Sequence, residues 1–173
     1  SRSISNLRGL TPLPVNPTFS QLLRSPVLLL AYGFGSGLSS RAPGTVGTLA
    51  AIPIWYWMSA WSLANYVIAV YLAALVGIYI CGRAAEKIGI HDPAGIVWDE
   101  FVGFWIAMLA VPPSWLALAV GFGLFRLFDI VKPWPIGWLD KHVDGGLGIM
   151  LDDIAAGLIT ALLMAALRVA GWL

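Results

Sequence analysis

Acidic residues stand inside stretches of this sequence that are otherwise apolar. Asp99 and Glu100 belong to DPAGIVWDEFVGFWIAMLAVPP, which runs from Asp92 to Pro113. A charge in a bilayer helix costs roughly 3 kcal/mol or more, so such residues are mostly functional and have partners. Asp92-Pro93 is typical of a helix start, which places Asp99 and Glu100 about two turns inside the predicted helix. The alternative is that both acids cap the helix, where free N–H groups favour negative charge.

The next apolar stretch supplies a partner in FRLFDIVKPWP. Arg126 and Asp129 are three residues apart and share one face of the predicted helix. At 1.5 Å per residue, Asp99 and Asp129 lie roughly 20 and 24 Å from the Pro112-Pro113 turn that joins the two helices. An antiparallel hairpin therefore brings the two carboxylates to a similar depth.

A second acidic pair, Asp152 and Asp153, opens the last apolar run in GGLGIMLDDIAAG. Capping is an equally good interpretation there, because acidic residues suit a first turn. Together the acids outnumber the nearby cations Arg126 and Lys132, so salt bridges alone would leave them repelling one another. A divalent cation removes this difficulty, and an all-oxygen ligand set suits Mg²⁺. The candidate cluster has five members: Asp99, Glu100, Asp129, Asp152 and Asp153.

A glycine-rich segment, GFGSGLSSRAPGTVGTL, runs from Gly33 to Leu49. It suits close helix packing, because Gly33 and Gly37 have small-xxx-small spacing. It equally suits an anion cradle, with Pro43 to Thr48 opening a helix whose N-terminus attracts phosphate. No Gly-Lys-Ser/Thr follows, so the segment is not a Walker A loop.

The elements that position these residues must lie in a membrane. Of the 173 residues, 59% are hydrophobic and 11% charged, against about 25% charged in a soluble domain, and the mean hydropathy is +0.83. A net charge of +1 gives no basic surface for nucleic acid. The single cysteine, Cys81, lies in an apolar run, and His91 and His142 lie in predicted loops, where they suit surface positions better than ligation.

The predicted fold is an all-α, polytopic membrane bundle in a single domain, 26–173, after a polar N-terminal arm, 1–25. The first apolar stretch, 26–38, is short and glycine-broken, which predicts a re-entrant or interfacial helix. Five stretches approach the length of about 20 residues that a span needs: 46–63, 65–82, 94–111, 114–130 and 154–173.

Basic residues predict the orientation, because Lys and Arg accumulate on the cytoplasmic side. The turns SAWSLAN and VPPSW, on the opposite side, carry no charge, and Arg168 is the one exception to the pattern. The N-terminus and the acidic cluster are therefore predicted to face the cytoplasm. Eight basic residues fall on that side: Arg2, Arg8, Arg24, Arg41, Arg83, Lys87, Lys132 and Lys141.

Four segments, in this order, resemble the phosphatidylglycerophosphatase A family: GFGSGLSSRAPGTVGTLAAIPIWYW, HDPAGIVWDEFVGFWIAM, FRLFDIVKPWPIGWLD and GGLGIMLDDIAAG. The resemblance covers nearly the whole chain after the arm. It implies a Mg²⁺-dependent phosphatase of the bacterial inner membrane. The expected substrate is the phospholipid phosphatidylglycerophosphate, which would yield phosphatidylglycerol and phosphate.

The resemblance also implies roles. Asp99 and Glu100 match the family's Asp-Glu pair, Asp129 its Phe-Asp, and Asp152 with Asp153 its Asp-Asp pair, which makes these five the expected catalytic and metal-binding residues. Four further residues are expected to bind the substrate phosphate: Thr45, Arg126, Lys132 and, with less support, Arg41. The nucleophile would be water, or Asp129 if an aspartyl-phosphate forms.

Two interpretations from other classes stay open. An ion-coupled transporter or channel would use buried carboxylates to carry cations, but inverted repeats are not evident. A purely structural membrane subunit would leave the acids unexplained. The sequence does not fix an oligomeric state or the number of metal ions.

Overall fold

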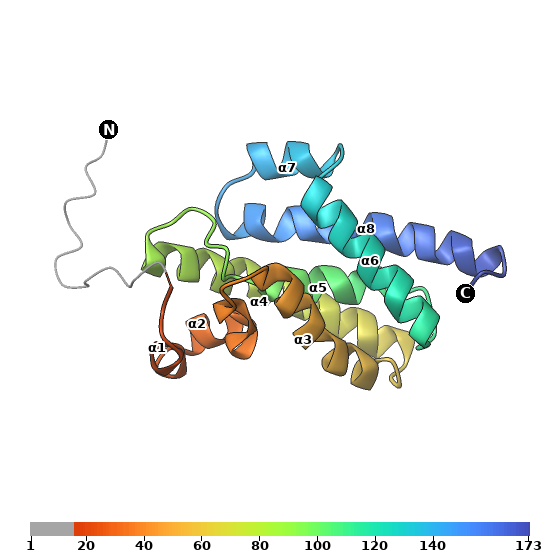
Figure 1. Cartoon of the computed structure of the whole chain (residues 1–173), viewed down its shortest axis with the longest axis horizontal. Coiled ribbons are helices and arrows are strands. Elements are labelled where there is room, and N and C mark those ends of the chain that lie inside the picture. Colours follow the sequence, from red (N-terminus) through yellow and green to blue (C-terminus); the bar gives the residue numbers. More distant parts are fainter. Residues whose placement is uncertain (1–15) are drawn as a thin grey trace.

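The computed structural model describes residues 16–173, and every regular element in this part of the chain is helical. This confirms the all-α prediction. Helices α4 and α8 run along the long axis of the molecule, and the shorter α5 lies among the other helices (Figure 1). The elements are α1 (Phe19–Leu23), α2 (Pro26–Ala31), the 3-10 helix η1 (Gly33–Leu38), α3 (Pro43–Met58), α4 (Leu63–Ile88), α5 (Trp98–Ala107), α6 (Trp115–Val131), α7 (Ile136–His142) and α8 (Gly145–Val169).

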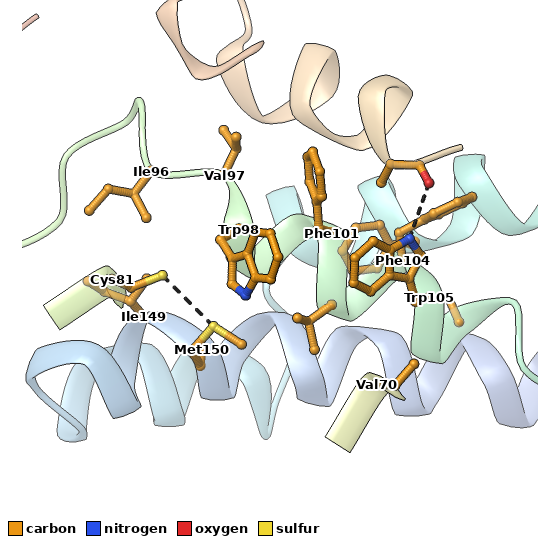
Figure 2. Close-up of a cluster of buried hydrophobic side chains, with 14 of the residues drawn as sticks. Val70, Cys81, Ile96, Val97, Trp98, Phe101, Phe104, Trp105, Ile149 and Met150 are labelled. Carbon is orange, nitrogen blue, oxygen red and sulfur yellow. Dashed lines mark hydrogen bonds between the residues drawn. The ribbon is translucent and has the colours of Figure 1, made fainter. Parts of the chain in front are cut away.

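Helix α5 is the centre of the hydrophobic core. It contacts α3, α4, α6 and α8, and nine of its ten residues are buried. Trp98 stacks on Phe101 and Trp105 meets Phe101 edge to face, both at a ring-centroid distance of 5.8 Å. Both indole N–H groups are satisfied: that of Trp98 donates to Ala73 O at 3.0 Å, and that of Trp105 donates to Ala51 O at 3.1 Å (Figure 2). The aromatic face of α5 therefore holds three neighbouring helices together.

The predicted start of α5 at Asp92-Pro93 is wrong. Residues 93–96 form a turn closed by Ile96 N–H to Pro93 O, and Val97 N–H donates to Ala31 O of α2 at 2.8 Å. These contacts tie the segment to α2 and delay the helix until Trp98. Asp99 and Glu100 consequently lie in its first turn and not two turns inside.

Helix α8, in contrast, begins earlier in the sequence than the last apolar run predicted. The glycine-rich GGLG forms the first turn of the helix, after Asp144 as N-cap residue. A Cβ atom at Gly146 would lie 1.9 Å from Ile78 O of α4, so the glycine permits close approach of the two helices. Asp152 and Asp153 are therefore two turns inside α8, which removes the capping interpretation for them.

Only α4 and α8, among the described residues, are both long and apolar enough to cross a membrane. The prediction of five spans is thus not confirmed. Helix α5 has ten residues and rises about 15 Å, half the thickness of a hydrocarbon core of about 30 Å. Helices α3 and α6 have 16 and 17 residues, just below and at the lower limit of about 17 residues for a span.

The first apolar stretch is broken, as predicted. Helix α2 ends at Ala31, and positive φ angles at Gly33, Phe34 and Gly35 redirect the chain through η1. Of the predicted arm, 1–25, residues 16–25 are described and include α1, whose Leu22 is fully buried. Arg2 and Arg8 lie outside the described residues.

Candidate active site

The five predicted acidic residues converge from three helices. Asp99 and Glu100 come from the first turn of α5, Asp129 from the last turn of α6, and Asp152 with Asp153 from α8. All five are buried. Because the N-terminal end of α5 meets the C-terminal end of α6, the two ends place their carboxylates at one level, as the hairpin argument predicted.

The carboxylates form two groups that overlap. Asp99, Glu100 and Asp153 each offer one oxygen within 4.8 Å of the others, and so do Asp129, Asp152 and Asp153. Asp153 belongs to both groups. Asp153 Oδ2 and Glu100 Oε2 are buried without a hydrogen-bond partner among the described residues.

Arg126 is the cation at one side of the cluster. Its guanidinium forms an ion pair with Asp129 and lies 3.8 Å from Glu100 Oε1. The prediction that Arg126 and Asp129 share a helix face is confirmed. Since only 13% of the Arg126 side chain is exposed, its charge acts on the carboxylates with little screening by water.

Lys132 is the cation at the other side. Its ammonium lies 2.6 Å from Asp152 Oδ2 and 2.9 Å from Asp140 Oδ1. Burial alone would lower the pKa of Lys132, but the hydrogen bonds to Asp152 and Asp140 raise the pKa above its ordinary value. Lys132 ends α6 in the left-handed region, with φ 49°. Sequence reasoning missed Asp140, which follows Lys132 by eight residues in the short helix α7 (IGWLDKH) and carries no signal of its own.

Helix α3 directs its N-terminus at the same cluster. The helix begins at Pro43 as predicted, and a Cβ at Gly44 would lie 2.5 Å from Glu100 Oε1 and 3.0 Å from Arg126 Nη2. Thr45 follows in the same turn and is half-buried, whereas Arg41 is exposed and forms no ion pair with a described residue. The structure thus brings Gly44 to the carboxylates and leaves Arg41 at the surface.

The remaining nucleophile candidates lie elsewhere. Cys81 is fully buried against Met150, with the sulfur atoms 4.0 Å apart. His91 pairs with Asp144, and His142 stacks on Trp138. None of the three belongs to the acidic groups.

This arrangement can bind a cation and a phosphate side by side. The ligand set consists of carboxylate oxygens, which suit Mg²⁺, and two of these oxygens are buried without a partner. Arg126, Lys132 and the N-terminus of α3 border the carboxylates and can hold an anion.

Comparison with known proteins identifies a family that covers most of the chain. The model of the family Phosphatidylglycerophosphatase A matches residues 29–168. A protein of that name from Escherichia coli (strain K12) is 51% identical over 140 residues, covering 80% of this chain and 81% of the relative. Another of that name, from Haemophilus influenzae, is 41% identical over 88% of this chain and 95% of its own.

A third relative carries a different name. A "putative phosphatidylinositol-3-phosphatase" from Bacteroides thetaiotaomicron is 39% identical over 82% of this chain and 92% of its own length. No solved structure gives a significant match.

Proposed function

Because this chain belongs to the phosphatidylglycerophosphatase A family and is therefore a phosphatase, we propose that it hydrolyses the terminal phosphomonoester of phosphatidylglycerophosphate. The products are phosphatidylglycerol and phosphate, in phospholipid biosynthesis. The observation that carries the proposal is the convergence of five buried carboxylates with Arg126 and Lys132. A transporter is not favoured, since the matched relatives are named as phosphatases.

Mg²⁺ is the proposed cofactor, held by Asp99, Glu100, Asp129, Asp152 and Asp153. The fit rests on the all-oxygen ligand set and on the two unpartnered buried oxygens. When bound, Mg²⁺ neutralises phosphate oxygens and makes water a stronger nucleophile.

The chain's own residues bind and orient the phosphate. Arg126 and Lys132 donate hydrogen bonds to its oxygens and stabilise the charge that develops during transfer. The N-terminus of α3, with Gly44 and Thr45, adds N–H groups that favour an anion. A carboxylate of the cluster accepts a proton from the attacking water; if the protein forms an aspartyl-phosphate instead, Asp129 is its proposed site.

We place the protein in the bacterial inner membrane, with several helices crossing it. Only 22% of the most apolar stretch of α4 is buried within the protein, whereas a soluble protein would bury such a helix. Exposed tryptophans occur towards both ends of the helices, Trp57 and Trp115 at one end and Trp134 and Trp138 at the other, as in interfacial belts. Arg168, the exception in the charge pattern, donates to Ala110 O at 2.9 Å.

A groove between α3 and α6 supports a lipid substrate. It has a volume of about 560 Å³ and is lined mainly by apolar side chains, among them Ile52, Trp55 and Leu118. Ile52 follows Gly44 by eight residues along α3, a rise of about 12 Å. An acyl chain in this groove would leave the phosphate end of the lipid near the acidic cluster.

The test is phosphate release by the purified protein in detergent. Release from phosphatidylglycerophosphate is expected to require Mg²⁺, to stop with a chelator and to return when Mg²⁺ is restored, because carboxylates alone cannot neutralise the phosphoryl charge. Phosphatidylglycerol, which has no phosphomonoester, is the negative control. Full activity in excess EDTA would contradict the metal requirement. Release from phosphatidylinositol 3-phosphate alone would contradict the substrate.

A further inference from the structure

The two acidic groups overlap at one side chain, and we propose that each group binds its own divalent cation, with the Asp153 carboxylate bridging the pair. The inference rests on the proposed metal-dependent phosphatase and adds the number of ions and the ligands of each. One ion takes Asp99, Glu100 and Asp153, and the other takes Asp129, Asp152 and Asp153.

The two groups share Asp153 and no other residue. Asp99 and Glu100 come within 4.8 Å of Asp153 as one group, and Asp129 and Asp152 do so as another. Mg²⁺ binds oxygens at about 2.0–2.1 Å, so its ligands lie at most about 4.2 Å apart. The 4.8 Å limit of each group is close to this span, so each group is near the size that one ion needs, and the carboxylates left out of one group belong to the other.

Asp153 provides the second, independent observation. Its side chain is almost completely buried, with 2% of the residue exposed, and its Oδ2 atom has no hydrogen-bond partner among the described residues. An unpaired buried polar group costs about 1–3 kcal/mol, and more when charged. Glu100 Oε2, in the first group, is also buried and unpaired. Both oxygens lack the partner that a cation would supply.

The charge of the cluster favours two ions over one. With Asp140, which shares Lys132 with Asp152, six carboxylates and the two cations Arg126 and Lys132 leave an excess of four negative charges. One divalent ion leaves a site with two negative charges, which would repel a phosphate dianion. Two ions neutralise the site, and two-metal sites of hydrolases hold both attacking and leaving oxygens. The rival explanation is that protons, not ions, neutralise the carboxylates.

Manganese binding distinguishes the two explanations without measuring turnover. The full chain, purified in detergent, is dialysed against Mn²⁺ and its bound manganese counted, and electron paramagnetic resonance reports whether bound ions are magnetically coupled. We expect about two ions per chain, with a coupled spectrum, as in two-metal sites. Asp99→Asn and Asp152→Asn should each keep about one ion and give the spectrum of isolated Mn²⁺.

Asp153→Asn should abolish the coupled spectrum and lose at least one ion. The matched control is Asp144→Asn, the same chemical change at an exposed carboxylate of the same helix, which should bind manganese as the wild type does. If Asp153→Asn does not fold, the single-ion spectra of Asp99→Asn and Asp152→Asn still decide the question.

Wild-type protein with one ion per chain, or Asp153→Asn with an unchanged coupled spectrum, would overturn the bridged pair. Phosphate release from phosphatidylglycerophosphate, measured on the same preparations, separates this from the proposed function. If the protein binds one ion and releases phosphate at the full rate, the bridged pair of ions is wrong and the proposed function stands. If it binds two coupled ions but releases no phosphate, the bridged pair stands and the proposed substrate is wrong.

Discussion

Gly44 is the residue through which α3 contacts the acidic cluster. The atoms that an added Cβ would meet, Glu100 Oε1 and two nitrogens of Arg126, are ends of side chains and not backbone. The fold can accommodate a methyl group there by moving these ends. Glycine at position 44 therefore matters more for the placement of Glu100 and Arg126 than for the stability of α3.

Gly44→Ala should lower kcat/KM at least tenfold while changing thermal stability little, because the methyl group displaces Glu100 and Arg126 from their places. Phosphate release and thermal unfolding are measured on the same sample. The control is Gly123→Ala on α6, where an added Cβ meets no atom within 4 Å. That control should be fully active and slightly more stable, by about 0.5–1 kcal/mol. Wild-type activity in Gly44→Ala would show that α3 does not shape the site.

Asp99→Asn and Asp129→Asn should each reduce turnover more than tenfold, with the protein still folded. Each removes one negative charge from a repelling cluster without changing its shape, so the apo form is not destabilised by that loss. The measurement is phosphate release at saturating Mg²⁺, with Asp144→Asn as control. More than about a tenth of wild-type turnover, which corresponds to roughly 1.4 kcal/mol of barrier, would remove that residue from the proposed mechanism.

The helices position these residues through contacts that are distant in sequence. The apolar stretches predict the longer helices, and the spacing of Arg126 and Asp129 predicts their pairing. The depth of the two acidic pairs within their helices, however, differs from expectation. Asp99 lies in the first turn of α5, and Asp153 lies two turns inside α8. The reasons are the Val97 N–H bond to Ala31 O and the Gly146 contact with Ile78 O. Local capping patterns contain neither contact, so the starts of α5 and α8 could not be predicted from the sequence, whereas the start of α3 at Pro43 could.

The crossing of α5 and α8 sets the depth of Asp153. A Cβ at Gly157, one turn after Asp153, would lie 2.4 Å from Gly103 O of α5, and a backbone atom cannot move aside as a side-chain end can. Gly157→Ala should therefore push the helices apart, destabilise the protein by about 1–3 kcal/mol and reduce activity. Thermal unfolding in detergent measures the first effect, against Gly123→Ala as the same substitution in open space. An unchanged melting temperature would contradict the tight crossing.

At the scale of the molecule, the turns that join α3 to α4 and α5 to α6 lie on the same side (Figure 1). The ends of α5 and α6 that carry the acidic cluster are the ends away from the turn between these two helices. Basic residues of the described part, including Arg83, Lys87 and Lys132, accompany the acidic end. By the positive-inside rule this end is expected to face the cytoplasm. The proposed substrate would then be hydrolysed in the inner leaflet.

Single cysteines test this orientation in a Cys81→Ser background. His91→Cys and His142→Cys should react with an impermeant thiol reagent only after the inner membrane of spheroplasts is opened. Ala60→Cys, exposed in the turn between α3 and α4, should react while the membrane is intact. Labelling of the histidine positions in intact spheroplasts would place the site on the outer face.

The short, buried α5 also has a consequence for how the protein is made. Ten residues, two of them acidic, cannot be inserted as an independent span, and the helix that covers α5 most extensively, α8, is synthesised later. Until the segment after Asp144 is synthesised, α5 lacks this partner, and Asp152 and Asp153 are missing from the acidic cluster. The closing of the core around α5 and the completion of the proposed catalytic cluster would then be one event, so a chain interrupted within α8 is expected to lack both.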